Sequence, residues 1–262
     1  MDSNLTDIDA VFLDLDGTIY LGGDLIDGSL DFLDRCDARG VQRYFLSNNS
    51  SRSVDQYVAK LQGLGIPASE DDVLLSTHDL ISWLHDSNYV RIYLVGTEGM
   101  REMLQGAGFT IDDCDPEIVV LGYDTEINYD KISMASIFLH KGVPMVASHP
   151  DMVCPSPDGG LPDTGAYMAM FEATTGVRPM HVCGKPEPGM ILHKIEALGL
   201  DPSRCAMVGD RLYTDMAMAT RAGVKGILVL SGEATEQDVG ALPDGAEQRP
   251  CLIVQSVDDL LR

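Results

Sequence analysis

The chain has 262 residues, of which 45% are hydrophobic and 23% charged, with a formal net charge of −23. This balance is typical of a globular protein and excludes a disordered one, and the length suits one to two domains. So negative a chain repels phosphate backbones and anionic headgroups. We therefore expect neither a nucleic-acid nor a membrane partner.

The sequence also indicates a compartment. It contains no run of about 18 apolar residues that could form a membrane-spanning helix, and its first residues lack the basic and apolar regions of a signal peptide. The six cysteines are widely spread without a C-x-x-C spacing, which favours thiols over disulfides or a zinc site. These features predict a cytoplasmic protein.

Short apolar runs alternate with amphipathic stretches from one end of the chain to the other. Strands are predicted over 10–15, 41–46, 91–95, 118–121, 143–147, 180–183, 206–208 and 224–230. Helices are predicted over 29–39, 54–64, 77–86, 98–105, 129–139, 168–174, 188–198 and 215–222, and the segments 252–254 and 257–261 end the chain. Strict alternation of strands and helices predicts an α/β fold with a doubly wound parallel sheet.

An acidic turn follows the first predicted strand, where Asp14-Leu15-Asp16-Gly17-Thr18 comes directly after an apolar run. Ligands of open α/β sheets gather at the carboxyl ends of the strands, and alternation points Asp14 and Asp16 the same way. Two such carboxylates repel unless a cation lies between them. The pair therefore indicates a divalent metal, with one carboxylate as nucleophile and the other as general acid and base. Gly17 lets backbone N–H groups approach phosphoryl oxygens.

Two further strand ends carry groups that suit a phosphoryl ligand. Ser47 and Asn48 end the second predicted strand, where a hydroxyl and a loop amide can donate hydrogen bonds to phosphoryl oxygens. Lys185 lies between Gly184 and Pro186, and its ammonium can offset the charge of a carboxylate nucleophile and of phosphate. A simple turn at Ser47 and a surface lysine before a helix are the alternatives.

The last acidic pair follows the strand predicted over 206–208. Asp210 is again an acid at a strand end, which suits a hard cation with oxygen ligands. Asp215 begins the next predicted helix and can orient the metal ligands as well as cap that helix. All four segments are loops between a strand and a helix. Because parallel strands bring such loops to one edge of the sheet, we expect them to meet there.

These motifs, in this order, resemble those of the haloacid dehalogenase superfamily of aspartate-nucleophile phosphotransferases. The stretches around Asp14, Ser47, Lys185 and Asp210 are similar to those of its NagD-like, or nitrophenylphosphatase-like, branch, and the resemblance runs over nearly the whole chain. It implies that the catalytic residues are Asp14, Asp16, Ser47 and Lys185. It further implies Mg²⁺ as the cofactor, with Asp14, Asp16, Asp210 and Asp215 at the metal and Gly17, Ser47, Asn48 and Lys185 at the phosphoryl group.

The resemblance also implies an inserted domain. The stretch from Ser47 to Lys185 is far longer than a core unit needs, and this branch places an α/β cap there. We therefore expect core segments at 1–79 and 180–262 and a smaller cap at 80–179, which closes over the site to exclude water and allows self-association.

Two cap residues are candidate substrate contacts. Asp163 stands where relatives often have a glycine-rich loop, so its carboxylate can bind sugar hydroxyls or disfavour highly anionic substrates. The alternative is that Asp163 caps the helix after it. His149 follows a predicted cap strand and is a candidate by its loop position.

The sequence thus predicts a magnesium-dependent phosphatase of small phosphomonoesters that works through an aspartyl phosphate. Sugar phosphates, nucleoside monophosphates and p-nitrophenyl phosphate are the expected substrate classes. Two alternatives use similar residues: a phosphotransferase or phosphomutase, in which an acceptor hydroxyl replaces water, and a phosphorylatable receiver-like signalling module. Product analysis and the lifetime of the phosphoaspartate distinguish them.

Overall fold

The computed structural model describes residues 7–156 and 158–262 and divides the chain into two compact units. The first unit comprises residues up to Ser47 together with Val58–Leu74 and Lys185–Arg262. The second comprises Asn48–Tyr57 and Leu75–Gly184. The second unit thus includes the whole of helix α3 (Ser76–Asp86) and of strand β12 (His181–Val182). The cap expected from the sequence, 80–179, begins within α3 and ends before β12.

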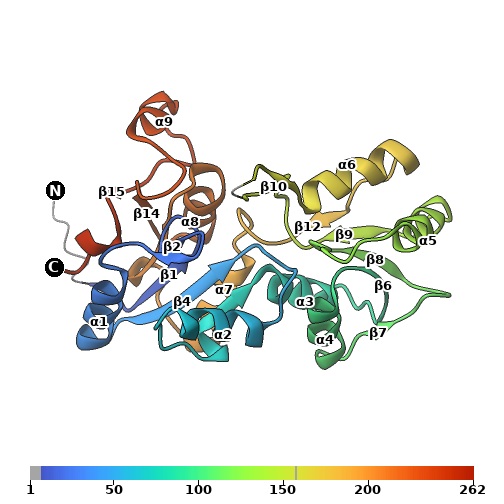
Figure 1. Cartoon of the computed structure of the whole chain (residues 1–262), viewed down its shortest axis with the longest axis horizontal. Helices are drawn as coiled ribbons and strands as arrows, with labels where there is room; N and C mark the ends of the chain where they lie inside the picture. Colours follow the sequence, from blue (N-terminus) through green and yellow to red (C-terminus); the bar gives the residue numbers. More distant parts are fainter. Residues whose placement is uncertain (1–6, 157) are drawn as a thin grey trace. The chain divides into compact units, whose positions relative to one another are not determined.

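The first unit is built on a six-stranded sheet with the strand order β15-β14-β13-β1-β4-β5 (Figure 1). Its strands are β1 (Ala10–Asp14), β4 (Gln42–Ser47), β5 (Val73–Leu75), β13 (Cys205–Gly209), β14 (Lys225–Val229) and β15 (Leu252–Val254). Strand β1 pairs in parallel with both β4 and β13. The chain continues from β1 toward one edge and returns later to fill the other, so β1 lies at the switch point where ligands of such sheets bind.

Both faces of this sheet are buried. Residues Phe12, Leu46 and Met207 face α7 (Gly189–Leu198) and α8 (Ala217–Ala222) in one apolar cluster. The alternating residues Val11 and Phe45 are also fully buried, as expected for a parallel sheet covered on both sides. The remaining helices of the unit are α1 (Ser29–Arg39), α2 (Val54–Gly63), whose first residues belong to the second unit, and α9 (Glu236–Ala241).

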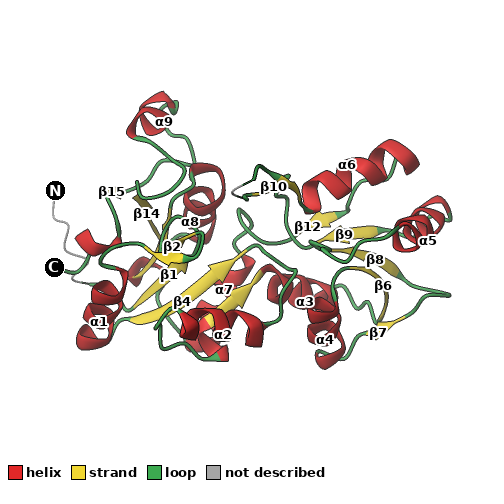
Figure 2. Ribbon diagram, in the orientation of Figure 1, coloured by secondary structure: helices red, strands yellow, loops and turns green. Residues whose placement is uncertain are grey.

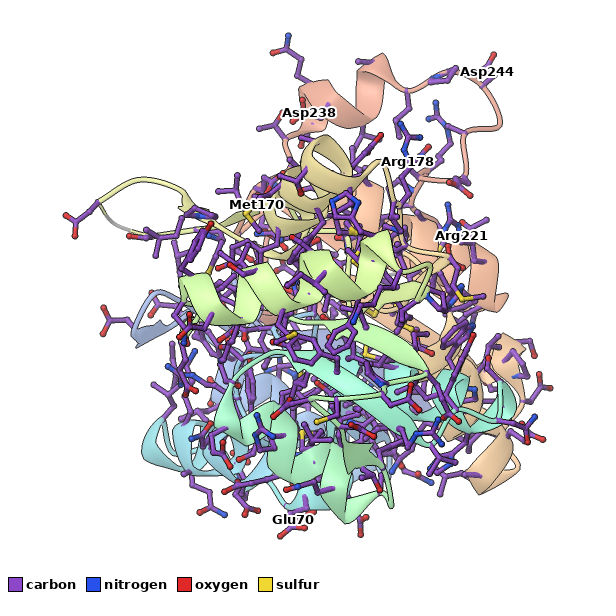
Figure 3. The ribbon with its side chains drawn as sticks, turned by 90° about the vertical axis from the view of Figure 1, so that its right-hand side faces the viewer. Glu70, Met170, Arg178, Arg221, Asp238 and Asp244 are labelled. Atoms are coloured by element: carbon purple, nitrogen blue, oxygen red, sulfur yellow. The ribbon has the colours of Figure 1, made fainter. Side chains whose placement is uncertain are left out.

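The second unit has its own five-stranded sheet, ordered β12-β9-β8-β6-β7, in which the paired strands are parallel (Figure 2). It contains β6 (Arg91–Val95), β7 (Thr110–Ile111), β8 (Ile118–Leu121) and β9 (Met145–Ala147) besides β12. Alternate residues of these strands pack against α3 and α4 (Glu98–Gly106) on one face and against α5 (Tyr129–His140) and α6 (Thr164–Thr175) on the other. In Figure 3, α5 and the α6 residue Met170 lie on the same side of the sheet.

The structure therefore confirms the α/β fold with parallel sheets, while several short elements were not expected. They are β5, β7, the antiparallel pairs β2 (Tyr20–Leu21) with β3 (Asp24–Leu25) and β10 (Val153–Cys154) with β11 (Leu161–Pro162), and α9. Most span two or three residues, too few to show a period. Helix α6 begins at Thr164, because the Asp163 side chain accepts a hydrogen bond from the Thr164 N–H. The helix expected at 215–222 is a π-helix over Leu212–Met216 followed by α8.

Within the described residues, the structure contains no helix of the length and apolarity needed to cross a bilayer. The compartment itself stays a prediction.

Candidate active site

Strand β1 ends at Asp14, which is paired in register with Leu46, the residue before Ser47. The chain then turns back on itself, and Gly17 adopts a positive φ of 87° there. A Cβ on Gly17 would lie 2.3 Å from Oδ2 of Asp210, so the close approach of the two loops requires a glycine. The turn after the central strand is thus shaped to bring the acids of β1 and β13 together.

Strand β13 and the π-helix after it position the other two acids. Asp210 follows the strand directly, and the backbone N–H of Glu233 donates to its Oδ2 at 2.7 Å. Asp215 lies within the π-helix, where the Arg211 N–H donates to its Oδ2 at 3.1 Å. A Cβ on Gly209 would lie 2.4 Å from Asp215, so this glycine makes room for the carboxylate. Sequence reasoning missed the role of Gly209, although it stands next to Asp210.

Asp14, Asp210 and Asp215 each offer a carboxylate oxygen within 4.8 Å of the others. Burial, and then the charge of Asp14, raises the pKa of Asp210 to about 7, and burial is also the main cause that raises the pKa of Asp215 to about 6. The Oδ1 atom of Asp210 is buried and has no hydrogen-bond partner among residues 7–156 and 158–262. Like charges held this close, with a bare buried oxygen, fit a hard divalent cation such as Mg²⁺.

Lys185 supplies a positive charge that is bonded directly to this group of acids. Its Nζ donates to Oδ1 of Asp14 and, at 2.8 Å, to Oδ1 of Asp215. Burial alone would lower the pKa of Lys185, but the charges of the two aspartates and its bonds to them raise the pKa above the usual lysine value. The lysine is therefore a fixed cation that holds Asp14 in place.

Asp16 lies beside this group but is not part of the three-carboxylate cluster. Burial raises its pKa, while the charge of Lys60 on α2 opposes that rise. Lys60 also lies over the ring of Tyr20, 3.9 Å from its centroid. Lys60 could not be recognised from the sequence, because a single lysine on a helix has no distinctive spacing.

The remaining expected residues divide between the units. Ser47 ends β4 in the first unit, and Asn48 is the first residue of the second. Asn48 is buried; its carbonyl accepts a hydrogen bond from Ser76 Oγ at 2.6 Å, and its Nδ2 donates to Asp151 at 3.2 Å. A role of Asn48 at the phosphoryl group stays a prediction.

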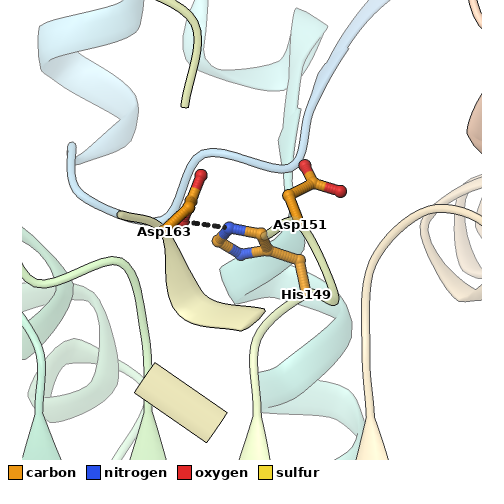
Figure 4. Close-up of side chains that lie close together, drawn as sticks. All are labelled: His149, Asp151 and Asp163. Atoms are coloured by element: carbon orange, nitrogen blue, oxygen red, sulfur yellow. Dashed lines mark hydrogen bonds and ion pairs between the residues drawn. The ribbon is translucent and has the colours of Figure 1, made fainter. Parts of the chain in front are cut away.

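His149 and Asp163 lie together in the second unit, where both are buried and His149 Nε2 is 2.9 Å from Asp163 Oδ1 (Figure 4). Sequence reasoning did not pair these two residues, because they lie in different segments. It also missed Asp151, which lies beside them. Together the three form a second group whose ligand atoms lie within 4.8 Å of one another.

Comparison with known proteins agrees with this geometry. Residues 11–110 match a family model described as haloacid dehalogenase-like hydrolase, and residues 182–260 match one described as HAD-hydrolase-like. An acid sugar phosphatase of Staphylococcus aureus is 36% identical over 234 residues, which is 88% of this chain and 89% of that protein. The chain belongs to the haloacid dehalogenase-like hydrolase family.

Solved structures of the family are similar over almost the whole chain. A 4-nitrophenylphosphatase from Thermotoga maritima superposes with a TM-score of 0.92 at 38% identity, covering 98% of this chain and 97% of that one. NagD from Escherichia coli gives a TM-score of 0.88 at 28% identity, covering 97% and 99%. A glycerol phosphate phosphatase from Mycobacterium tuberculosis, in complex with magnesium, gives 0.91 at 28% identity, covering 99% of this chain and 78% of that one. The expected resemblance to this branch is thereby confirmed.

Proposed function

We propose that this haloacid dehalogenase-like hydrolase is a Mg²⁺-dependent phosphatase of small phosphomonoesters that works through a phosphorylated Asp14. The observation that carries the proposal is the meeting of Asp14, Asp210 and Asp215 within 4.8 Å, with Lys185 bonded to two of them. Sugar phosphates, nucleoside monophosphates and p-nitrophenyl phosphate are the proposed substrates. The names of the sugar, nitrophenyl and glycerol phosphate phosphatases among the relatives support this class.

The acids of the first unit suit the proposed metal by charge and by ligand type. Asp14, Asp210 and Asp215 offer carboxylate oxygens, and the bare Oδ1 of Asp210 is a ready ligand atom. When bound, Mg²⁺ supplies positive charge that stabilises the oxygens of the transferring phosphoryl group. The magnesium in the M. tuberculosis phosphatase supports this assignment. Ligation by Asp16 remains part of the proposal.

The chain's own residues account for the two chemical steps. In the first, a carboxylate oxygen of Asp14 forms a bond to phosphorus while the ester oxygen leaves with a proton from Asp16. In the second, Asp16 takes a proton from the water that attacks phosphorus, which releases phosphate and restores Asp14. The raised pKa of Asp16 supports its role as a proton donor. Lys185 orients Asp14 and offsets the charge that develops there.

Phosphate release and trapping of the intermediate test this mechanism together. Wild-type protein with Mg²⁺ should release phosphate from p-nitrophenyl phosphate and from glycerol phosphate, and Asp14→Asn should lose at least about 10⁴-fold in kcat. Rapid acid quenching should give a phosphorylated peptide that contains Asp14, detected by mass spectrometry. Full activity of a clean Asp14→Asn protein would refute the proposal.

The same experiment separates the two alternatives. A phosphotransferase or phosphomutase would give a phosphorylated acceptor in place of free phosphate. A receiver-like module would retain its phosphoaspartate for hours. We expect neither result, because the second unit, with its separate sheet, suits a substrate cap better than a signalling output. Its role as a cap and self-association through this unit stay predictions. The contacts of His149 and Asp163 with substrate that the sequence suggested likewise stay a prediction, and the bonds of these two residues favour a different role.

A further inference from the structure

The second unit contains a polar cluster that the proposed chemistry does not use: His149, Asp151 and Asp163 (Figure 4). His149 is fully buried and Asp163 is 5% exposed. Their ligand atoms and those of Asp151 lie within 4.8 Å of one another, so the residue types alone would allow a metal ion. The hydrogen bonds around the cluster indicate a different role.

Both ring nitrogens of His149 already have partners. Nε2 lies 2.9 Å from Asp163 Oδ1, and Nδ1 lies 2.9 Å from Ser148 Oγ. Ser148 Oγ lies 3.0 Å from Ser50 Oγ, which accepts the Tyr123 N–H at 2.8 Å. One arrangement of protons satisfies the whole chain of bonds: Ser50 donates to Ser148, Ser148 donates to Nδ1, and Nε2–H donates to the Asp163 carboxylate. A cation could enter only by breaking these bonds.

The His149–Asp163 bond closes a loop. His149 stands immediately before residues 150–162, which carry the antiparallel pair β10 and β11, and Asp163 stands immediately after them. The start of α6 holds the same loop, because the Gly165 N–H donates to the Asp151 carbonyl at 2.8 Å. A Cβ on Gly165 would lie 2.5 Å from the Pro150 carbonyl, so only glycine permits this approach. The backbone at Asp151 is therefore fixed from two sides.

The fixed Asp151 in turn holds the loop that follows Ser47. Both of its carboxylate oxygens accept from Asn48 Nδ2, at 3.2 and 3.4 Å. Two residues further on, Ser50 is tied to Ser148. Ser148 thus bonds to Ser50 and Asp151 bonds to Asn48, in both cases through side chains. Ser76 Oγ donates to the Asn48 carbonyl at 2.6 Å. The segment that leaves the end of β4 is held within the second unit at three points.

We propose that His149, Asp163 and Asp151 are positioning residues that act through Asn48 on the phosphoryl-binding backbone after Ser47, and that they form neither a metal site nor a contact with the leaving group. The inference rests on the proposed function. It follows from the bonds above. His149 and Asp163 bond to each other across the base of the 150–162 loop, and Asp151 bonds to Asn48 in the 48–50 loop. Loss of the cluster should weaken binding of the phosphoryl group of every substrate by the same factor.

Asp151→Ala tests the proposal directly. We expect KM for p-nitrophenyl phosphate, KM for glycerol phosphate and the inhibition constant of inorganic phosphate all to rise by about tenfold, since a hydrogen bond to a charged group is lost. Asp151→Asn, which keeps an acceptor oxygen for Asn48, should recover most of that loss. Asp158→Ala, an exposed acid of the same loop, is the matched control and should change none of the three constants.

The path from His149 to Asp151 has its own test. If His149 acts through Asp151, the double variant of His149→Gln with Asp151→Ala should be no weaker for phosphate than Asp151→Ala alone. Should the His149 variant fail to fold, Asp163→Asn, which keeps an acceptor oxygen, replaces it in the same cycle. Additive losses would overturn the path.

Three outcomes would overturn the positioning role. KM values that change for one ester and not the other, with an unaltered phosphate inhibition constant, would indicate direct contact with the leaving group. Mn²⁺ or Zn²⁺ bound by the wild type in equilibrium dialysis and lost in Asp151→Ala would indicate a metal site. The wild type could be active and dependent on Asp14 while Asp151→Ala leaves all three constants unaltered; that result would refute the positioning role alone. Activity that survives Asp14→Asn would instead refute the proposed function.

Discussion

The two units each contain one tight group of potential ligand atoms, and the groups differ in how their charges are balanced. In the first unit Lys185 bonds to two of three carboxylates, and Oδ1 of the third, Asp210, is buried without a hydrogen-bond partner among the described residues. In the second unit His149 is bonded at both ring nitrogens and Asp151 accepts from Asn48. Similar spacing of ligand atoms therefore accompanies an unbonded buried oxygen in one unit and a closed hydrogen-bond network in the other.

This difference matters because an unbalanced buried charge raises free energy until a ligand, a proton or a metal compensates it. The raised pKa values of Asp210 and Asp215 express that cost, which a functional site retains. A satisfied network instead fixes the backbone around it. Proximity of metal-ligating residue types is therefore a weak criterion, and the bonds already made decide between the two roles.

Removal of one carboxylate from the first group should have the largest effect. Asp210→Asn should lower kcat/KM for p-nitrophenyl phosphate by about 10³-fold at millimolar Mg²⁺, because metal charge stabilises the transition state by several kcal/mol. Steady-state kinetics over a Mg²⁺ titration measures this loss. Asp244→Asn, an exposed acid on another loop of the same unit, is the control. Wild-type rates in Asp210→Asn would erase the distinction between the two groups.

Loss of the lysine should come next. Lys185→Met keeps an unbranched side chain that is one atom shorter but removes the charge bonded to Asp14 and Asp215, so kcat should fall by about 10²- to 10³-fold. Lys225→Met, at an exposed position that starts β14, should leave kcat unchanged. A fall in kcat of less than threefold would mean that the lysine is structural. In that case the first group would resemble the second.

The smallest effect concerns pH and stability. The folded-state pKa values of Asp210 (about 7) and Asp215 (about 6) lie above the ordinary 3.8. The contribution of these two groups to the free energy of unfolding is therefore fully present below about pH 4, where they are protonated, and is lost as the pH rises through 6 and 7. Added Mg²⁺ should restore the lost stability. The rise in Tm caused by Mg²⁺ should therefore be about 3 °C larger at pH 8 than at pH 5.5. Differential scanning calorimetry measures the effect, and Asp210→Asn should reduce its pH dependence to the part that Asp215 contributes.

Much of both units could be predicted from local patterns. The helix at 29–39 and the strands at 91–95 and 118–121 match the structure residue for residue, because apolar period and glycine stops are local signals. The convergence expected of Asp14, Asp210 and Asp215 follows from a general rule of parallel sheets. Asp14 ends a strand, Asp210 directly follows one and Asp215 lies in the helix after it, and one sheet gathers such positions at one edge.

The α/β fold, the family resemblance and the acids of the first unit could be predicted from the sequence, because these depend on residue type, period and order along the chain. The folded structure was needed to show that His149 bonds Asp163, that Asp151 accepts from Asn48 and that Gly17 and Gly209 make room for carboxylates. Those partners are far apart in sequence or are defined by an absent side chain. Their contacts arise when separate elements pack, and no local pattern encodes them.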